Sequence, residues 1–425
     1  MKIVADFHIH SKYSRACSKI LELNNIETTC RQKGIQLIGT GDFTYPAWQK
    51  SIENELEEIA NTGLFKLKEA LDDQVRFILT TEVSLVYKKN DKCRRIHIVI
   101  HAPNLESIQE LNKQLDKDYN IRSDGRPILG MSTEKLMKLL FSISPDFLVY
   151  PAHIWTPWYA VFGSKSGFDS MKECFGDWTD HVFAYETGLS SDPEMNWRLS
   201  GLDKLTMLSN SDAHSLPNLA REANVFELKE ASYQEINQVI KNNANSSNAK
   251  DNQSYLDYTI EFYPEEGMYH YDGHRSCDIS LHPDETNKNK KICPKCGKPL
   301  IIGVMNRVDE LADRKEGYKS ENKPGFKKLV ELDKIIAESI GVKSRNSKKV
   351  QEIYQNTLEM LNSTELDILL NVNTDDIAKI SGKTLAEGIK RVRNGQLHIK
   401  PGYDGVYGEV KIFNAEEIKN QKQLF

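Results

Sequence analysis

The chain has 425 residues, of which 39% are hydrophobic and 28% are charged, so it is long enough for two or three domains that each bury a core. No apolar stretch approaches the roughly 18 residues of a membrane span, and seven cysteines, an odd number, favour a reducing compartment over a disulfide framework. A membrane protein, a fibre and a small secreted protein are therefore excluded, and we expect a cytoplasmic, multidomain enzyme.

The formal net charge of −5 is unevenly distributed along the chain. Residues 286–350 contain 17 Lys and Arg against 8 Asp and Glu, a local net charge of +9, so the rest of the chain has −14. This division predicts an acidic catalytic part that can hold cations and a basic arm that can follow a phosphate backbone. The plainer alternative is a lysine-rich surface that only contacts solvent.

The first half of the chain alternates short apolar runs with helical patterns. The first run belongs to MKIVADFHIH, which resembles a buried strand rather than a signal peptide. The predicted strands are residues 2–7, 35–40, 75–80, 96–100, 147–150, 182–185 and 205–208, and predicted helices between them include 51–60, 105–115 and 133–141. Strands that alternate with helices indicate a parallel sheet. Seven such units predict an α/β fold with a closed or nearly closed β/α barrel.

The second half of the chain contains a polar linker, a short segment with few apolar residues and a long helical region. Residues 241–254 are almost free of apolar side chains and predict a surface loop or linker. Residues 267–303 contain too few apolar residues for a core, and from residue 325 onward the pattern is helical, over 325–340, 348–361, 364–370, 374–380 and 384–394. We therefore predict three domains: a barrel at 1–266, a small module at 267–305 and a basic helical domain with a tail at 306–425.

Metal-ligating side chains stand where the predicted strands end. They are His8, His10, Asp42, Glu82, His153, Glu186, Asp212 and His214. The carboxyl ends of barrel strands converge at one mouth, where such folds place their chemistry. Imidazole and carboxylate ligands suit zinc, manganese or iron, and eight or nine of them exceed the needs of one catalytic ion. Two or three ions side by side predict phosphoester hydrolysis.

The fourth predicted strand leaves a choice between two histidines. IHIVIHAP has His97 near its start and His101 at its end, and the position of a strand end favours His101. Both residues are kept as alternatives at this point.

Several motifs resemble the PHP (polymerase and histidinol phosphatase) superfamily. They are DFHIHSKYS, TGDFTYP, TEVS, IHIVIHAP, PAHIW and SNSDAH. The resemblance implies a distorted seven-stranded β/α barrel with a trinuclear metal site, and it favours His97 over His101 as the ligand. The chain departs from the family pattern at Arg15 and Ala16, where a further His is frequent, and at Asp42, where a His is common. These departures weaken the expectation of a third ion.

The resemblance also implies a distribution of ligands among the ions. One ion would be held by His8, His10, Glu82 and Asp212, and Glu82 would bridge to a second ion held by His97 and His153. A third ion would be held by Asp42 and His214, while Glu186 would be either a ligand or a partner that orients one. The ions would be zinc, with manganese or magnesium as alternatives, and Asp212 and Glu82 are the predicted catalytic residues.

The small module contains a zinc-binding pattern. His274-Arg-Ser-Cys277 and Cys293-Pro-Lys-Cys296 form an HxxC…CxxC pair, and Cys-Pro-x-Cys-Gly is typical of a zinc knuckle. Four protein ligands complete a tetrahedron and leave no position for water, so this zinc is predicted to be structural. His282 is an alternative to His274 as the fourth ligand.

Taken together, the motifs resemble the endonuclease Q family along essentially the whole chain. The segments that carry this resemblance are WTPWYAVFGSKSGFDS, ETGLSSDPEMNWR, REANVFE, YHYDGHR and IKPGYDGVYG. The family implies a DNA repair endonuclease that cuts the phosphodiester 5′ to uracil, hypoxanthine or xanthine, or at abasic sites. Two alternatives stay open: a small-molecule phosphatase of the histidinol-phosphate type, and a nucleic-acid-binding protein with a vestigial metal site.

Candidate DNA contacts lie close to the predicted ligands. Lys165, Arg198 and Arg221 are in predicted loops where a phosphate can be held, and the aromatic residues 155, 158, 159 and 162 follow His153, where an extruded base can stack. The last five residues, from Gln421 to Phe425, resemble the short peptide by which repair proteins bind the bacterial sliding clamp. DNA with deaminated bases and a sliding clamp are therefore the predicted partners.

Overall fold

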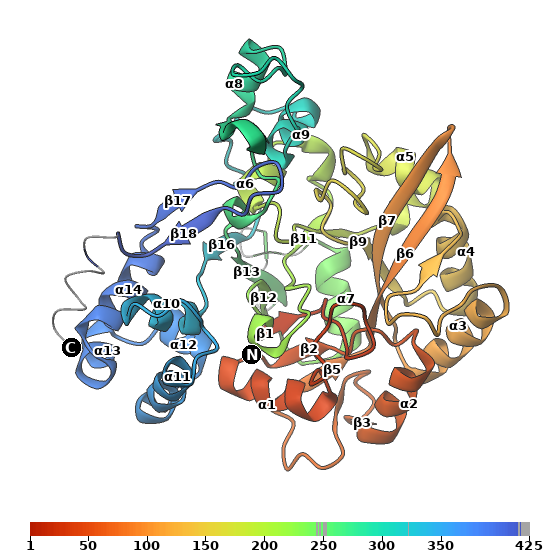
Figure 1. Ribbon diagram of the computed structural model, residues 1–425. Helices are drawn as coiled ribbons and strands as arrows, with labels where there is room; N and C mark the ends of the chain where they lie inside the picture. The colour runs from red at the N-terminus through yellow and green to blue at the C-terminus, as the bar shows by residue number, and fades with distance from the viewer. Residues whose placement is uncertain (244, 246–247, 250–252, 322, 415–416, 418–425) are drawn as a thin grey trace.

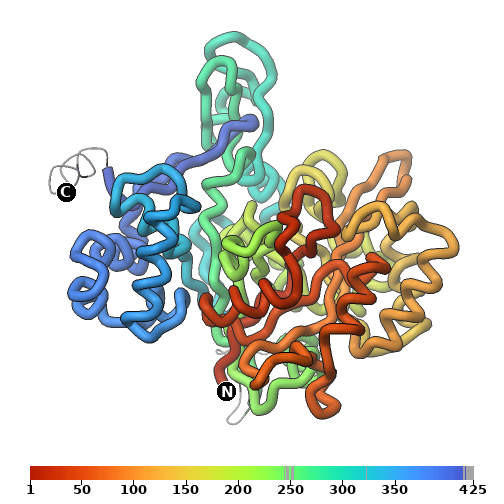
Figure 2. The backbone as a smooth tube through the Cα atoms, turned by 60° about the horizontal axis from the view of Figure 1, so that its bottom comes forward, coloured from red at the N-terminus to blue at the C-terminus, as the bar shows by residue number. Residues whose placement is uncertain are grey.

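The computed structural model describes residues 1–425 except 244, 246–247, 250–252, 322, 415–416 and 418–425. Figure 1 shows a large α/β part that contains the N-terminal half of the chain, a small protruding part around residues 270–310, and a helical part at the C-terminal end. Figure 2 shows the same three parts from another direction. Among the described residues, no helix combines the length and apolar character that crossing a membrane requires.

The elements of the α/β part begin and end as follows. Its strands are β1 (Lys2–Asp6), β2 (Leu37–Gly39), β3 (Leu56–Glu58), β4 (Phe65–Leu67), β5 (Arg76–Ile78), β6 (Thr80–Lys89), β7 (Lys92–His101), β8 (Ile128–Leu129), β9 (Leu148–Pro151), β10 (Ala184–Glu186), β11 (Thr206–Leu208), β12 (Ala223–Glu227) and β13 (Tyr255–Glu261). Its α-helices are α1 (Leu23–Lys33), α2 (Pro46–Glu55), α3 (Leu105–Asp118), α4 (Thr133–Ile143), α5 (Met171–Phe175), α6 (Pro193–Asn196) and α7 (Tyr233–Lys241). Ser132 and Ser232 begin α4 and α7 as N-caps, since each side chain accepts a backbone N–H of the first turn.

All seven predicted strands are present, but their pairing is not uniformly parallel. β1, β2 and β5 form a parallel ladder, whereas β12 pairs antiparallel with β1. β6 and β7 form an antiparallel hairpin over residues 80–101, and β9 pairs antiparallel with β7. The prediction of a wholly parallel sheet was therefore wrong around β7, because a tight turn replaces the expected helical crossover.

The α/β part contains an eight-stranded sheet (β16-β13-β12-β1-β2-β5-β4-β3, with β16 at residues 325–328), a four-stranded sheet (β8-β6-β7-β9) and the parallel pair β10-β11. β9 lies beside β10, and an isolated bridge between Ile9 and Ala213 joins the segments that follow β1 and β11. This arrangement brings the ends of strands from distant parts of the chain to one place. The described ladders are separate sheets, and a closed seven-stranded barrel stays an expectation.

The remaining elements belong to the small and helical parts. They are β14 (Asp272–His274), β15 (Ile279–Leu281), α8 (Pro283–Lys288), α9 (Val304–Leu311), β16 (Gly325–Lys328), α10 (Leu332–Ser339), α11 (Lys348–Leu361), α12 (Glu365–Leu370), α13 (Thr374–Ser381), α14 (Lys383–Arg393), β17 (His398–Lys400) and β18 (Glu409–Lys411). The predicted helices of this region are confirmed except at residues 325–331: residues 325–328 pair with β13 as a strand, and α10 begins only at Leu332. The prediction of a helix over 51–60 was wrong beyond residue 55, because residues 56–58 form β3.

The core explains why the strands are short and apolar. Phe7, Phe77, Tyr150 and Phe226 are at most 1% exposed, and they belong to the two hydrophobic clusters that form the core. Burying side chains of this size supplies the main stabilising free energy of the domain. The polar residues at the strand ends are buried as well, and this is unusual unless they have partners.

Candidate metal centre

The first ligand group combines side chains that follow two distant strands, β1 and β11, with one side chain of β6. Its members are His8, His10, Glu82 and Asp212, with one ligand atom from each within 4.8 Å of the others. His8 Nε2 and His10 Nε2 lie 3.4 and 3.3 Å from Glu82 Oε2, and His10 Nε2 lies 3.1 Å from Asp212 Oδ1. His8 Nε2 is buried and makes no hydrogen bond among the described residues. A metal ion is the natural partner of such an atom, so this group fits a divalent cation.

The second ligand group shares Glu82 with the first. Glu82 Oε1 lies 2.7 Å from His97 Nδ1 and 3.2 Å from His153 Nε2, and all three side chains are buried. One carboxylate oxygen thus belongs to each group, as in centres where a carboxylate bridges two ions. His101 is outside both groups, because its Nε2 bonds to the hydroxyl of Tyr150 at 3.0 Å. Of the two candidate histidines, the geometry brings His97 to the centre.

Two carboxylates orient the histidines of the first group. Asp42 Oδ1 lies 2.9 Å from His10 Nδ1, while Asp42 Oδ2 accepts hydrogen bonds from Ser11 and Ser14. Both oxygens of Glu186 lie 3.0 Å from His8 Nδ1. A carboxylate on the far nitrogen of an imidazole fixes the ring and its tautomer. Asp42 and Glu186 therefore have the geometry of orienting residues.

The expected third ion has no comparable group among the described residues. His214 Nδ1 lies 2.8 Å from the backbone oxygen of Asp212, and its ring lies 4.6 Å from that of His10. The oxygens of Asp42 are occupied by His10 and the two serines. The groups of three or more ligands in the described chain do not include Asp42 or His214.

Burial and charge act in opposite directions at this centre. Burial disfavours the charged forms of His8 and His10, but the surrounding carboxylates, Glu186 and Asp42 first, hold both pKa values well above the ordinary range. The same contacts keep the pKa values of Glu82 and Asp212 well below theirs in spite of burial. At His97, burial outweighs the attraction of Glu82 and lowers the pKa to about 4. Glu82 and Asp212 are thus ionised, as carboxylate ligands of a metal must be.

The backbone is strained at three of these positions. Asp42, His153 and Asp212 have φ of 47°, 27° and 46°, in the left-handed region that non-glycine residues rarely adopt. Arg221 supports the strained Asp212 backbone, since its Nε donates to the Ser211 carbonyl at 2.9 Å. Such conformations persist where the surrounding structure imposes them, and they cluster at functional sites.

Sequence reasoning missed one charged residue of the centre, Arg126. Its Nη1 lies 2.9 Å from Glu82 Oε2, and its side chain is 25% exposed at the edge of the site. The residue stands between α3 and β8, outside every predicted strand end, so neither periodicity nor spacing could identify it.

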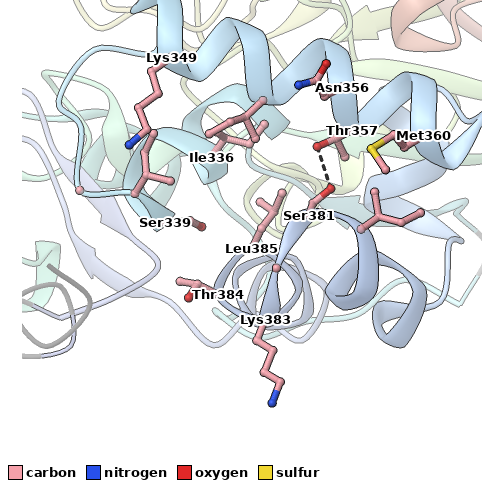
Figure 3. A pocket seen from close by; sticks show the side chains of 15 residues that line it. Ile336, Ser339, Lys349, Asn356, Thr357, Met360, Ser381, Lys383, Thr384 and Leu385 are labelled. Atoms are coloured by element: carbon pink, nitrogen blue, oxygen red, sulfur yellow. Dashed lines mark hydrogen bonds between the residues drawn. The ribbon is translucent and has the colours of Figure 1, made fainter. Parts of the chain in front are cut away.

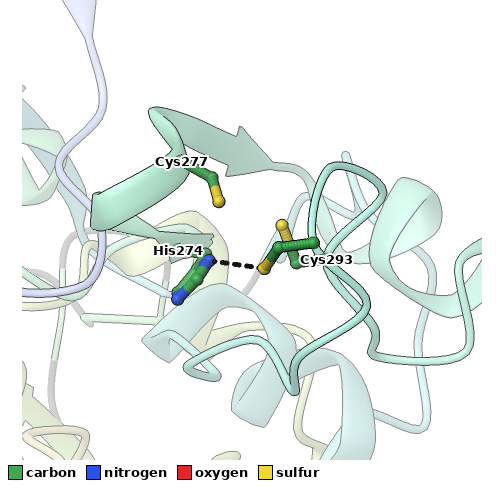
Figure 4. A group of neighbouring side chains, drawn as sticks. His274, Cys277 and Cys293 are labelled. Atoms are coloured by element: carbon green, nitrogen blue, oxygen red, sulfur yellow. Dashed lines mark hydrogen bonds between the residues drawn. The ribbon is translucent and has the colours of Figure 1, made fainter.

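The second cluster lies in the small part of the molecule and consists of His274, Cys277, Cys293 and Cys296 (Figure 4). Their ligand atoms lie within 4.8 Å of one another, and His274 Nδ1 is 3.4 Å from Cys296 Sγ. Although burial favours the thiol, backbone N–H groups of Cys296 and Lys295 lower the pKa of Cys293 to about 6. The set of four donors fits a structural zinc ion.

His282 is engaged elsewhere in the same module. It is the N-cap of α8, where its side chain accepts the N–H of Asp284 and Glu285 completes a capping box. This hydrogen bond leaves His274 as the histidine of the cluster.

The predicted DNA contacts differ in their surroundings. Lys165 is exposed. Arg198 is 6% exposed and pairs with Asp309 on α9 at 2.7 Å, so its guanidinium joins two parts of the protein. Arg221 is half-buried and engaged with the Ser211 carbonyl. Contact with DNA stays a prediction for all three residues, and Arg198 in addition connects two parts of the protein through its pair with Asp309.

The aromatic residues that follow His153 also differ in their exposure to solvent. Trp155 and Phe162 are buried against each other with ring centroids 5.0 Å apart, so they belong to the core. Tyr159 packs on His97, while Trp158 is 41% exposed and meets Tyr269 edge-to-face. Of this set, Trp158 is the side chain that is accessible for stacking.

A separate cavity of about 490 Å³ opens between helices of the helical part (Figure 3). Its lining is mainly apolar, with Ile336, Met360 and Leu385, and it includes Lys349 and Lys383 from the first turns of α11 and α14. It has no group of metal-ligating side chains among the described residues. The cavity is therefore distinct from the metal centre.

A known protein family matches the helical part of the chain. Residues 331–396, which span α10–α14, match the model of the MJ0043 C-terminal domain. Over 271 residues, the chain is 33% identical to protein MJ0043 of Methanocaldococcus jannaschii; this match covers 62% of the chain but only 32% of that relative. It is also 27% identical to protein YqxK of Bacillus subtilis, over 96% of the chain and 99% of that protein.

Two solved structures match the whole chain. The lesion-specific endonuclease PfuEndoQ of Pyrococcus furiosus is 30% identical, with a TM-score of 0.83 and 99% coverage of both chains. An endonuclease Q bound to a 27-mer duplex with an abasic lesion at its active site is 31% identical, with a TM-score of 0.82, over 99% of this chain and 98% of that one. The chain therefore belongs to the endonuclease Q family.

Proposed function

We propose that this protein is a metal-dependent DNA repair endonuclease that hydrolyses the phosphodiester on the 5′ side of deaminated bases and abasic sites. The observation that carries the proposal is the pair of ligand groups that share Glu82, buried where a strand-end site is expected. Membership of the endonuclease Q family supports the substrate class, since one relative is complexed with a duplex that has an abasic lesion at its active site.

The donor sets fit two divalent ions in the centre and one zinc ion in the small module. Ions held there would polarise a phosphoryl oxygen and lower the pKa of water, which supplies a nucleophile near neutral pH. The protein's own residues fix the geometry: Glu82 spans the two groups, Asp42 and Glu186 hold His10 and His8 in orientation, and Arg126 adds a permanent positive charge. Asp212 and Glu82 are the carboxylates closest to the proposed reaction.

The rest of the molecule is suited to hold DNA. Lys288, Lys290 and Lys295 are exposed on the small module, and Lys348 and Lys349 are exposed at the start of α11. These residues belong to the basic segment 286–350, and they support the proposal that the module and the helical part contact the phosphate backbone. We retain the division into domains at 1–266, 267–305 and 306–425. The run of strands from β1 to β11, joined again by the Ile9–Ala213 bridge, supports the distorted β/α barrel.

The tail from Gln421 to Phe425 lies outside the described residues, and binding of a sliding clamp stays a proposal based on the sequence QKQLF. A cytoplasmic location likewise stays an expectation. The small-molecule phosphatase is less favoured, because it has no use for the module and the helical part. A vestigial centre is less favoured because the ligand groups are intact and convergent.

The proposal is tested with purified protein and a 5′-labelled duplex that contains one uracil, one hypoxanthine or one abasic site. We expect cleavage 5′ to each lesion when Zn²⁺ or Mn²⁺ is supplied, and no cleavage of the undamaged duplex. Loss of cleavage in a chelator, with recovery on adding metal, is expected from the donor set. A protein that hydrolyses small phosphate monoesters but leaves every duplex intact would be a phosphatase instead.

A pair of matched variants assigns the activity to this centre. Asp212→Asn removes a ligand charge and is expected to lower the cleavage rate at least about 100-fold, since a preorganised charge at the reacting centre is lost. Asp177→Asn is the control, because its carboxylate is fully exposed in the 3₁₀ helix at residues 176–181. Equal rates for the two variants would contradict the assignment.

A further inference from the structure

The loop that bears Arg126 is held rigidly against the metal centre. Its Gly125 donates to the Tyr13 carbonyl at 3.0 Å, and the Gly125 carbonyl accepts the Thr44 hydroxyl. A Cβ at Gly125 would lie 2.4 Å from Asp42 Oδ2, so only glycine permits this close approach. On the other side, the Ser84 N–H donates to the Pro127 carbonyl. The loop is thus fixed both to the segment after His10 and to the strand that bears Glu82.

The guanidinium of Arg126 is only partly used by this arrangement. Nη1 donates to Glu82 Oε2 at 2.9 Å, and the other guanidinium N–H groups have no acceptor within the described parts of the chain. The side chain is 25% exposed, so part of it is accessible to a ligand at the edge of the site. A planar guanidinium has five donors in a fork that matches a phosphate group. The free N–H groups of Arg126 therefore lie next to Glu82 Oε2, the carboxylate oxygen that belongs to the first ligand group.

Charge balance gives this residue a role. Asp42, Glu82, Glu186 and Asp212 contribute four negative charges, which two divalent ions would neutralise. A phosphodiester brings one negative charge more, and the charge on its oxygens grows as hydrolysis proceeds. Apart from these two groups, the described residues form no further ligand group at this centre that could hold another ion. Among the described residues, Arg126 is the one lysine or arginine that pairs with the shared carboxylate of Glu82, at 2.9 Å.

We propose that Arg126 is a catalytic residue that binds the scissile phosphate of DNA: its free N–H groups donate to a non-bridging oxygen in the role that a third ion has in a trinuclear site. This inference rests on the proposed function. The guanidinium is retained by the protein throughout the reaction, and no bond to it forms or breaks. Its contribution is electrostatic stabilisation that grows as the phosphoryl oxygens gain charge.

The test compares Arg126→Ala and Arg126→Lys with the control Arg122→Ala. Arg122 lies on the same loop, but its guanidinium pairs with exposed Asp116 outside the centre. Single-turnover cleavage of a labelled duplex with one abasic site is expected to fall about 100- to 1,000-fold in Arg126→Ala and to stay unchanged in Arg122→Ala. The lysine variant keeps the charge but loses the fork, so its rate should lie between the two. Millimolar guanidinium chloride should partly restore Arg126→Ala and leave Arg126→Lys unaffected.

Two further measurements separate phosphate binding from a purely structural role. Bound metal, measured by mass spectrometry, should be equal in wild type and in all three variants. Binding to the same duplex is also measured in a chelator at several salt concentrations. The slope of the binding constant against salt should show that Arg126→Ala releases about one counterion fewer than wild type, whereas Arg122→Ala releases the same number. A wild-type rate in Arg126→Ala, or a fall that only follows a loss of bound metal, would overturn the inference. If the wild-type protein cleaves no damaged duplex, the proposed function itself fails, and the role of Arg126 fails with it.

Discussion

Replacing Glu331 by glutamine should destabilise the protein in a strongly pH-dependent way. Glu331 precedes α10 and is 5% exposed. Its carboxylate lies 3.0 Å from Arg345 Nη1 and 3.1 Å from Lys334 Nζ. Arg345 also donates to the carbonyl of Pro217, two residues before Leu219 of the α/β part. The carboxylate is therefore the centre of an ion-pair cluster that connects the helical part to the segment beyond His214.

The magnitude follows from the pKa of this carboxyl group. Burial alone would raise it, but Lys334 and Arg345 lower the pKa of Glu331 from 4.5 to about 2. A difference of one pKa unit corresponds to about 1.4 kcal/mol, so the ionised carboxylate contributes about 3 kcal/mol to the free energy of unfolding. Because the folded pKa lies below the unfolded one, this contribution is complete above pH 4.5 and is lost as the pH falls toward 2.

The assay is urea unfolding followed by circular dichroism at a series of pH values from 7 to 3, with equal metal supplied. Glu331→Gln should unfold with a free energy about 3 kcal/mol lower at pH 7, and the difference from wild type should shrink below pH 4.5. Glu359→Gln is the matched control, since Glu359 is exposed on α11. A difference below about 0.5 kcal/mol at pH 7, or one that stays constant down to pH 3, would refute the reasoning.

Three other predictions concern the metal sites and the tail. Cys293→Ser should lose the zinc ion of the small module while His282→Ala keeps it, as counted by metal analysis, and equal zinc contents would contradict the ligand set. Asp42→Asn should weaken binding of a divalent ion in the centre about 10- to 100-fold, because His10 loses its orienting carboxylate; titration calorimetry with an unchanged affinity would exclude this role. Deletion of residues 421–425 should abolish binding to a sliding clamp in a binding isotherm and leave cleavage of short duplexes unchanged, and clamp binding by both forms would refute it.

Much of the metal centre could be predicted from the sequence because its ligands follow short apolar strands. His8 and His10 are two residues apart, so both side chains lie on one face of the extended segment. Asp42, His153 and Asp212 each directly follow a strand or lie within a few residues of its end. Periodicity locates such strands well, and convergence at one mouth follows from the fold class. The knuckle cysteines were predictable for a different reason, since the spacing of their motif is local.

The choice between His97 and His101 was not accessible to the same reasoning. The two residues are four apart and face the same side of β7, so alternation does not separate them. Strand-end reasoning favoured His101 because it assumed that β7 runs parallel to its neighbours. In the structure β7 runs antiparallel to β6 and β9, and its carboxyl end therefore lies opposite the site. His97 reaches Glu82 because the direction of the strand is reversed.

Not every basic residue of the segment 286–350 is available to DNA, because its arginines are engaged in contacts within the protein. Arg307 bonds to the carbonyls of Phe162 and Phe168, and Arg314 pairs with Asp203. With Arg345 in the Glu331 cluster, the three arginines of residues 286–350 all join the helical or small part to the α/β part. Each of the partners in the α/β part lies more than 100 residues away in the sequence, so local composition could not identify these pairs. The exposed lysines therefore supply the positive charge that is available to a phosphate backbone. Lysine binds phosphate as a point charge, without the bidentate geometry of arginine. Contacts of this kind favour binding to DNA of any sequence over recognition of a particular sequence.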